Sequence, residues 1–243
     1  MRLSNSSIEV LSLFTNKTLW GHVLDALFPP SCAGCQKGGT FLCLDCVNKF
    51  IPVKQPSCFF CGKLTSHFES CPSCRSKTHL SGVIPAFYYS DLVKKVIAQF
   101  KYHDLAALDE ALASYMAESI LRYPEVVARL HGLVPIPLHF WRKSFRGYNQ
   151  AALLAGKLSS LLNKPLYPGL ARVKATLIQA KLSKEARRTN LENAFRWERE
   201  PLMGRNILLV DDVATSGETL NEAARALRRA GAREVWGAIF AKG

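Results

Sequence analysis

The chain has 243 residues, of which 48% are apolar and 21% are charged. This composition predicts a globular protein of one or two domains and excludes a disordered one. The 32 Lys and Arg residues against 19 Asp and Glu residues give a net charge of +13, which favours polyanionic partners such as nucleic acids or phosphorylated metabolites. Ile8–Phe14 and Leu19–Phe28 are too short to span a bilayer, and no signal-peptide pattern is present, so we expect a cytoplasmic protein.

The chain divides into two unlike regions, which we predict to be domains at residues 1–80 and 81–243. In the first, the apolar residues of Leu19–Phe28 fall on one face of a helix, which Pro29-Pro30 ends because a residue before proline avoids the α region. All eight cysteines lie between Cys32 and Cys74, an arrangement not expected of a secreted protein held together by disulfides.

The cysteines form four C-x-x-C knuckles, and two such turns supply the four thiolates that a tetrahedral Zn²⁺ site prefers. Redox disulfides and iron–sulfur ligation are the alternatives, although a redox motif usually stands alone beside a βαβ unit. We expect two structural Cys₄ zinc sites paired in sequence order, with a cross-braced pairing of the first and third knuckles left open. The ligands of the first site are Cys32, Cys35, Cys43 and Cys46, and those of the second are Cys58, Cys61, Cys71 and Cys74.

Strand and helix patterns alternate through residues 81–243, which predicts an α/β fold with a mostly parallel sheet flanked by helices. The expected strands are Val83–Tyr89, Leu133–Ile136, Ile207–Val210 and Val235–Ala241, and Pro85 places the first of them at a sheet edge. The expected helices cover Leu92–Phe100, Leu105–Leu121, Asn149–Leu162 and Glu218–Ala230, the last ending at Gly231.

Two adjacent carboxylates, Asp211 and Asp212, follow the apolar strand Ile207–Val210. The next residues, Ala214-Thr215-Ser216-Gly217-Glu218-Thr219, form a small polar turn that leads into a helix. Open α/β sheets bind ligands at the carboxyl ends of their strands, and a helix N-terminus favours a phosphate. An acidic pair suits the two hydroxyls of a ribose, so this segment predicts a site for a sugar phosphate.

Other folds with similar segments fit less well. A receiver domain has an acidic pair near its start, but only 33 residues follow Val210 here. Neither the G-x-x-x-x-G-K-[ST] loop nor the G-x-G-x-x-G loop occurs. An acidic pair that only ends a strand and caps a helix remains the structural alternative.

The segment resembles the signature of type I phosphoribosyltransferases, which use phosphoribosyl pyrophosphate (PRPP). Together with the four knuckles it resembles the ComF/GntX family over nearly the whole chain. Two further segments carry the resemblance. The first is Pro137, Leu138 and His139 with Arg142, Arg146, Gly147, Asn149 and Gln150; the second is Thr176, Gln179, Leu182, Arg187, Asn190, Asn193, Ala194 and Phe195.

The resemblance implies a PRPP site in which Asp211 and Asp212 hold the ribose as the catalytic pair and Mg²⁺ accompanies the pyrophosphate. It assigns the PRPP 5-phosphate to the turn Ala214–Thr219. It assigns the pyrophosphate to Leu138, His139, Arg142 and Arg146. It also implies a hood over the site at about residues 172–197, with Thr176, Gln179, Arg187, Arg188 and Asn190 as its functional residues.

The family resemblance also implies a role in natural transformation, in DNA uptake, with a helicase-like competence ATPase as a partner. Residues 137–205 carry 14 Lys or Arg and 4 Asp or Glu, a net charge of +10. PRPP accounts for part of this charge, and single-stranded DNA is attracted by the same field. Two hypotheses result: a phosphoribosyltransferase that transfers or hydrolytically releases ribose 5-phosphate, and a non-catalytic PRPP-sensing or DNA-binding scaffold.

Overall fold

The computed structural model describes residues 30–102, 108–138, 148–174 and 192–243. The described helices are α3 (Leu44–Val47), α4 (Pro72–Arg75), α5 (Asp91–Tyr102), α6 (Leu108–Leu121), α7 (Pro124–Arg129), α9 (Gln150–Leu162) and α11 (Glu218–Arg229). The described strands are β1 (Gly82–Tyr88), β2 (Gly132–Pro135), β3 (Leu170–Arg172), β4 (Phe195–Trp197), β5 (Asn206–Ala214) and β6 (Glu234–Lys242). The helix expected at Leu19–Phe28 lies outside the described residues.

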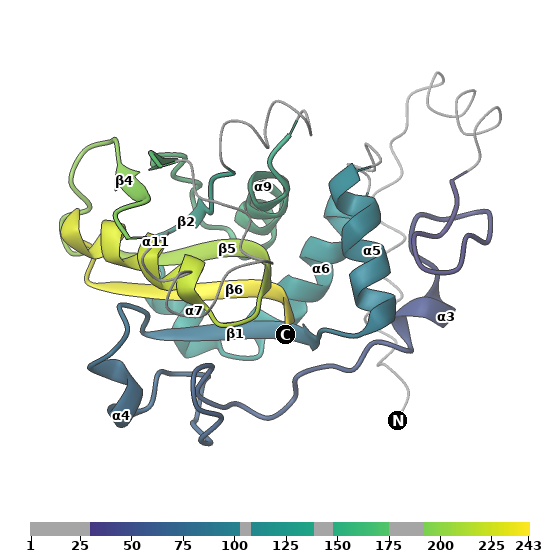
Figure 1. Ribbon diagram of the computed structural model, residues 1–243, viewed down its shortest axis with the longest axis horizontal. Coiled ribbons are helices and arrows are strands. Elements are labelled where there is room, and N and C mark those ends of the chain that lie inside the picture. The colour runs from purple at the N-terminus through teal and green to yellow at the C-terminus, as the bar shows by residue number, and fades with distance from the viewer. Residues whose placement is uncertain (1–29, 103–107, 139–147, 175–191) are drawn as a thin grey trace.

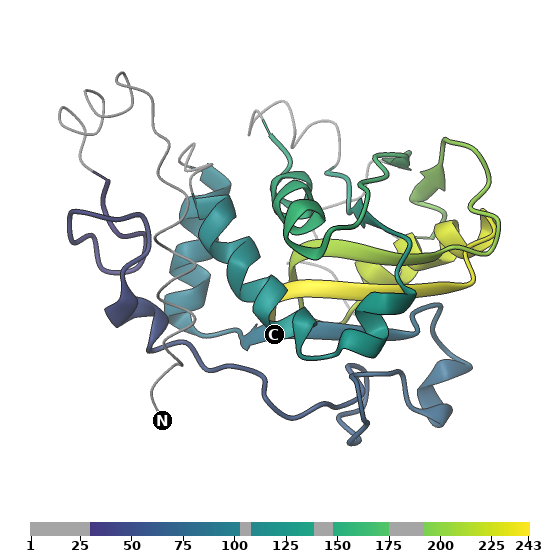
Figure 2. The same cartoon turned by 180° about the vertical axis from the view of Figure 1, so that it is seen from behind.

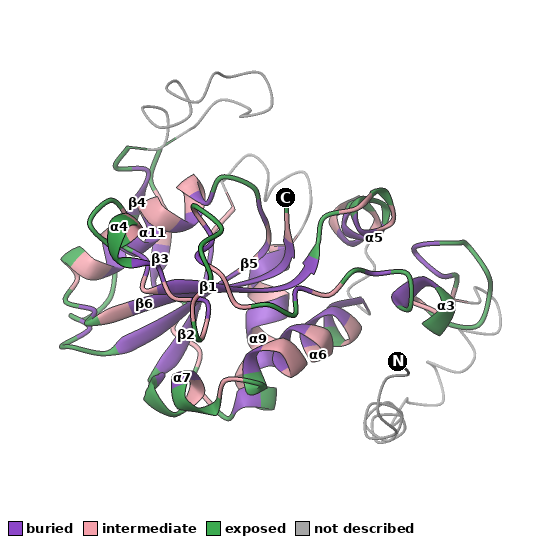
Figure 3. Ribbon diagram, turned by 90° about the horizontal axis from the view of Figure 1, so that it is seen from below, coloured by how far each residue is buried: buried purple, intermediate pink, exposed green. Residues whose placement is uncertain are grey.

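Four of the strands form a parallel sheet in the order β1-β6-β5-β2 (Figure 1). Helices α6, α7 and α9 cover one face, and α11 with the antiparallel pair β3-β4 covers the other (Figure 3). Leu208 and Val210 of β5 pack into the core on the first face, whereas Leu209 packs into the core on the second. A strand buried on both faces is apolar throughout, which is why β5 begins as a continuous apolar run.

The connections that follow β2 and β5 run in opposite directions along the sheet. After β2 the chain passes through α9 and returns on the outer side of β2, where Leu166 pairs in parallel with Leu133. After β5 it passes through α11 to β6, on the other side of β5. The sheet therefore has its topological switch point between β2 and β5, and ligands of open α/β sheets bind outside the carboxyl ends of strands at such a point.

The helix boundaries follow local signals that the sequence contains. The Asn149 side chain accepts a hydrogen bond from the Ala151 N–H at 3.2 Å and so caps α9, which ends at Asn163 in a left-handed conformation (φ 49°). Helix α11 ends at Arg229, and Gly231 adopts a φ of 92°. Among the described residues, no helix is both long and apolar enough to cross a membrane.

The cysteine-rich region packs along β1, which is an edge strand as Pro85 predicted. Val53 N–H donates to Ala86 at 3.0 Å and Tyr88 N–H donates to Ile51 at 2.8 Å, on the side of β1 away from β6. Ser70 N–H donates to Ser81 at 2.8 Å near the other end of the strand. These bonds satisfy backbone groups that an exposed edge strand would leave free for aggregation. Seen from behind, the chain between α3 and α4 runs alongside β1 (Figure 2).

The tightest point of this packing is Gly82, the first residue of β1. A Cβ atom at Gly82 would lie 2.5 Å from the Phe68 carbonyl oxygen and 2.5 Å from the Trp236 ring. We therefore expect Gly82→Ala to lower the free energy of unfolding by about 1–3 kcal/mol, because overpacking forces backbone to move. The matched control is Gly156→Ala in α9, where a Cβ would meet nothing within 4 Å. That substitution should stabilise the helix by about 0.5–1 kcal/mol. Urea denaturation measures both, and a Gly82→Ala protein as stable as the wild type would contradict this packing.

Candidate functional site

The cysteines form two groups of four, and the members of each group are those expected from sequence order. Within each group the four Sγ atoms all lie within 4.8 Å of one another. The Cys35 and Cys43 sulfurs are 3.6 Å apart and the Cys61 and Cys71 sulfurs 3.4 Å apart, distances far too long for a disulfide bond of about 2.05 Å. A tetrahedron of sulfurs at about 2.3 Å from Zn²⁺ has edges of about 3.8 Å, so both groups fit the metal.

The protonation chemistry of the thiols also fits a divalent cation. Although burial acts most strongly in the opposite direction, backbone hydrogen bonds lower the pKa of Cys32 to about 6 and that of Cys58 to about 7. The pKa of Cys46 is raised to about 12 by burial and by its cysteine neighbours, and that of Cys74 to about 12 by its hydrogen bond with Cys61 and by burial. Each group thus holds one ready thiolate but cannot ionise fully without a cation to balance it.

We therefore expect two Zn²⁺ ions per chain. Binding of structural zinc supplies about 10–16 kcal/mol in small peptides, which is large for a region with so little core of its own. Elemental analysis of fully reduced, full-length protein should find both ions, and removal by a chelator should unfold the cysteine-rich region. A content of one ion or fewer would contradict the assignment of two sites.

Asp211 and Asp212 lie near the carboxyl end of β5, which extends to Ala214 and so is longer than the four residues expected. The extension arises because β6 runs on to Lys242 and pairs with residues 211, 213 and 214 of β5. The Asp211 carboxylate accepts a hydrogen bond from the Asp212 N–H at 2.9 Å, and that of Asp212 accepts one from the Val213 N–H at 2.8 Å. Both carboxylates are thus held by the backbone of their own strand.

Asp212 is 7% exposed, and its carboxylate forms an ion pair of 2.6 Å with Lys101 at the end of α5. The Lys101 side chain is itself 25% exposed. Because a buried carboxylate is costly unless it is paired, this contact offsets the cost of burying the Asp212 side chain. Sequence reasoning missed Lys101, since a lysine in the last turn of an amphipathic helix is an ordinary feature and no local motif relates it to β5.

Asp211 is in a less favourable position. Burial is the main cause that raises the pKa of Asp211 well above its usual range, and the charge of Asp212 raises it further, whereas Lys101 acts to lower it. Two carboxylates side by side with one described cationic partner thus leave the site short of positive charge. A ligand that brings hydroxyl donors or a cation to this pair would relieve that imbalance.

This shift predicts how stability depends on pH. Because the folded-state pKa of Asp211 exceeds its unfolded-state value, the native state binds the proton more tightly, and stability increases as pH falls from the raised value towards the ordinary value of about 3.9. Above the raised value the cost of the ionised carboxylate is fully present. Asp211→Asn should therefore raise the melting temperature at neutral pH, by about 2–4 °C for each kcal/mol relieved, with a gain that shrinks on acidification. Thermal melts from pH 4 to 8 measure this, and a variant that melts below the wild type throughout would contradict it.

The turn after β5 lies at the same edge of the sheet. Thr215 and Ser216 are exposed, Gly217 is buried with a φ of 75°, and α11 begins at Glu218, where no side chain of the described residues caps the helix. Only glycine adopts such a φ without strain. Thr219 is half-buried in the first turn of α11. The turn therefore presents an uncapped helix N-terminus and two hydroxyls, a combination suited to a phosphate.

Leu138, at the start of the predicted pyrophosphate loop, comes two residues after Ile136 in the segment that leaves β2. The Ile136 N–H donates to Val210 at 2.9 Å, so the segment leaving β2 follows the edge of β5, and Asn149 holds it through a bond of 3.0 Å to the Ile136 carbonyl. The structure thus brings the start of this segment alongside Val210, the residue before the acidic pair. The other predicted residues, His139, Arg142 and Arg146 of the loop and Thr176, Gln179, Arg187, Arg188 and Asn190 of the hood, lie outside the described residues.

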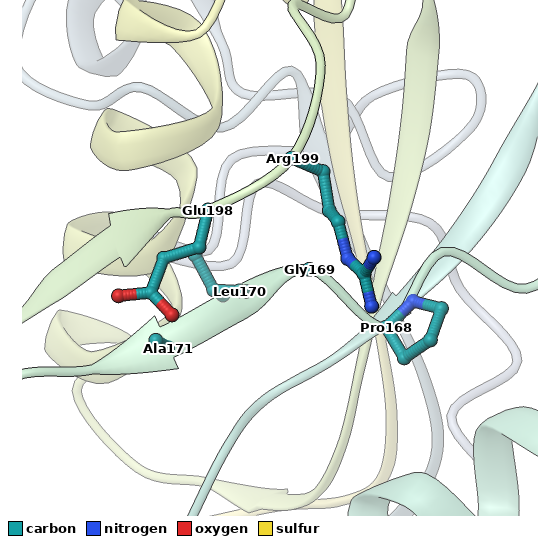
Figure 4. A pocket seen from close by; sticks show the side chains of 6 residues that line it. All are labelled: Pro168, Gly169, Leu170, Ala171, Glu198 and Arg199. Atoms are coloured by element: carbon teal, nitrogen blue, oxygen red, sulfur yellow. The ribbon is translucent and has the colours of Figure 1, made fainter.

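Two cavities of the described residues lie away from the acidic pair. One of about 210 Å³ lies between β3 and the segment after β4, and the side chain of Arg199 extends across it towards Pro168 (Figure 4). A neighbouring cavity of about 650 Å³ includes Tyr167, Trp197 and Arg205, the residue directly before β5. Arg205 is at the amino end of β5, so these cavities are at the opposite end of the sheet from the acidic pair.

Comparison with known proteins gives matches to both regions. Residues 23–75 match the double zinc ribbon domain family, and residues 117–243 match the phosphoribosyl transferase domain family. Competence protein F of Haemophilus influenzae is 33% identical over 85% of this chain and 88% of its own length. Competence protein ComFC of Bacillus subtilis is 31% identical over 78% of this chain and 79% of its own.

Two further matches cover less of the sequence. DNA utilization protein YhgH of Escherichia coli K12 is 35% identical over 61% of this chain and 67% of its own length. Among solved structures, one described as the allosteric regulatory enzyme of purine biosynthesis matches with a TM-score of 0.38 and 19% identity, over 58% of this chain and 29% of that chain.

Proposed function

Because this chain belongs to the ComF/GntX family, in which a double zinc ribbon precedes a phosphoribosyltransferase domain, we propose that it binds PRPP with Mg²⁺ at the carboxyl edge of its sheet. It transfers ribose 5-phosphate to an acceptor or releases it hydrolytically. The observation that carries the proposal is the acidic pair of β5 next to a phosphate-type turn at the topological switch point. The names of the relatives, two of which are competence proteins, support a role in DNA uptake during natural transformation. The family resemblance adds a cytoplasmic location and a helicase-like competence ATPase as a partner to this proposal.

In this reaction the bond between C1 of ribose and the pyrophosphate oxygen breaks, and its electron pair leaves with the pyrophosphate. Positive charge develops on the ribose ring until an acceptor, or a water that loses its proton to solvent, supplies an electron pair to C1. Asp211 and Asp212 accept hydrogen bonds from the ring hydroxyls and place negative charge beside the developing cation. Bound Mg²⁺ supplies neutralising charge at the pyrophosphate.

The remaining proposed roles are those that the family resemblance implies. The turn Ala214–Thr219 holds the 5-phosphate. Leu138, His139, Arg142 and Arg146 hold the pyrophosphate. The proposed hood, residues 172–197, closes over the site and keeps water away from C1. Its two ends are paired in the antiparallel strands β3 and β4, where Arg172 is opposite Phe195. The chain is proposed to consist of the ribbon domain at 1–80 and the transferase-like domain at 81–243.

The acidic pair provides the direct test of this function. Asp211→Asn together with Asp212→Asn removes two charge-assisted hydrogen bonds, each worth about 1.5–3 kcal/mol, so PRPP affinity in the presence of Mg²⁺ should fall at least about tenfold. Calorimetry with PRPP measures the change. The matched control is Glu234→Gln, which neutralises a carboxylate at the amino end of β6, and it should bind PRPP like the wild type. Unchanged affinity in the folded double variant would refute the assignment, and a pyrophosphate-release assay across acceptors then tests catalysis.

A non-catalytic scaffold that binds PRPP or single-stranded DNA is the second candidate, favoured by the net charge of +10 over residues 137–205. If phosphates are neutralised by these side chains, DNA affinity falls with salt at a log–log slope of about −0.7 per contact. If the DNA surface overlaps the PRPP site, PRPP with Mg²⁺ also weakens DNA binding at fixed ionic strength. Titration of a labelled single strand measures both effects. If saturating PRPP leaves the DNA affinity unchanged, the DNA binds on a different surface. A log–log slope of DNA affinity against salt near zero would refute electrostatic binding.

A further inference from the structure

The second cysteine group lies directly against the turn that follows the acidic pair. Phe59 and Phe60 are the two middle residues of the knuckle between Cys58 and Cys61. A Cβ atom at Gly217 would lie 2.8 Å from Cε1 of Phe59 and 3.1 Å from Cε1 of Phe60. Both ring edges therefore touch the backbone of the turn, at the residue whose conformation brings the chain into α11.

The two rings are firmly held where they meet Gly217. Phe59 is 7% exposed and belongs to the same core as Ala214, the first residue of the turn, and Leu220, the residue after it. The Phe60 ring packs edge-to-face on it, with centroids 5.6 Å apart, and the Lys242 ammonium lies 5.1 Å from the centre of the Phe59 ring. Because protein interiors are close-packed, the knuckle cannot move without a movement of the turn.

The segment after the second cysteine group contacts the first turn of α11 as well. The side-chain oxygen of Asn221 accepts hydrogen bonds from the Thr78 hydroxyl at 2.8 Å and from the His79 N–H at 2.7 Å. The turn thus contacts residues within the second cysteine group, and the start of α11 contacts residues that follow the same group.

The first cysteine group packs on a different element. A Cβ atom at Gly34 would lie 2.7 Å from the Cys46 sulfur and 3.0 Å from Leu92 of α5. Ala33 and Val47 belong to the core on the α5 and α6 face of the sheet, separate from the core that contains Phe59. The two groups have the same ligands and the same kind of knuckle. Phe68 of the second group also belongs to the first core, but its Phe59-Phe60 knuckle packs on the turn, whereas the first group packs on α5.

We propose that Phe59 and Phe60 are positioning residues for the phosphate turn, and that metal in the second cysteine group, but not in the first, sets the conformation of that turn. The inference rests on the proposed function in taking the turn as the site of the PRPP 5-phosphate. A metal bound by Cys58 and Cys61 fixes both ends of the four-residue knuckle. The rings between them then hold Gly217 in a geometry suited to a phosphate, and loss of the metal frees the knuckle and the turn together.

Substitution of one ring tests the positioning role. Phe60→Ala should weaken the binding of PRPP and of ribose 5-phosphate about tenfold or more, the scale of losing one hydrogen bond to a charged group. Inorganic pyrophosphate, which does not use the turn, should bind as it does to the wild type, and Phe60→Leu should recover most of the loss. The matched control is Phe41→Ala, a partly buried phenylalanine of the first cysteine group that packs on the other core. A general loss of structure would weaken both ligands equally, and that result would overturn the positioning role.

A second measurement tests the metal and needs no PRPP. Cys61→Ser and Cys35→Ser remove equivalent exposed ligands, one from each group, and each should leave one zinc per chain. Amide hydrogen exchange of the peptide 214–221 should accelerate in Cys61→Ser and in Phe60→Ala and remain unchanged in Cys35→Ser. Equal exchange in the two cysteine variants would overturn the inference. Failure of the wild type to bind PRPP would instead refute the proposed function, while the exchange difference would still test the coupling.

Discussion

The parallel pairing of β5 between β2 and β6 is the constraint on which the rest of this structure depends. Its first residues are buried on both faces, and its pairing with β6 continues through residue 214. The strand therefore delivers two carboxylates and a glycine turn at the edge of the sheet where the β2 connection departs. If β5 were an edge strand, or ended four residues earlier, neither the acidic pair nor the turn would have a fixed position.

This placement has an electrostatic consequence. Two adjacent carboxylates at the end of a buried strand are partly removed from water, and the described structure gives them a single cation, Lys101, which contacts Asp212. Asp211 is left with an elevated pKa. Such strain is typical of binding sites, where stability is given up in favour of a ligand that completes the charge balance. A sugar with vicinal hydroxyls and an accompanying divalent cation has the required chemistry.

The ribbon region is more than an appendage to the sheet. Its backbone covers β1 at both ends, and the Phe59-Phe60 knuckle supports the turn at Gly217. In the coupling that we propose, the rigidity of the knuckle comes from its four sulfurs and the metal that they fit. The zinc ribbon then supports the phosphate turn of the phosphoribosyltransferase fold.

Much of this protein was determined by the sequence alone. The alternation of strands and helices, the edge position that Pro85 imposes and the helix end at Gly231 follow from local spacing and backbone preference. The pairing of the cysteine knuckles, which the sequence left open, was decided by the structure. The acidic pair and the following turn were also evident, because the residues that carry their chemistry are consecutive.

The remainder was decided by tertiary structure. The β5 extension depends on the length of β6, the Lys101–Asp212 pair joins residues 111 positions apart in sequence, and the ring contacts at Gly217 join segments more than 150 positions apart. No local pattern encodes such contacts, because they arise only when the parallel sheet brings the carboxyl ends of its strands to one edge.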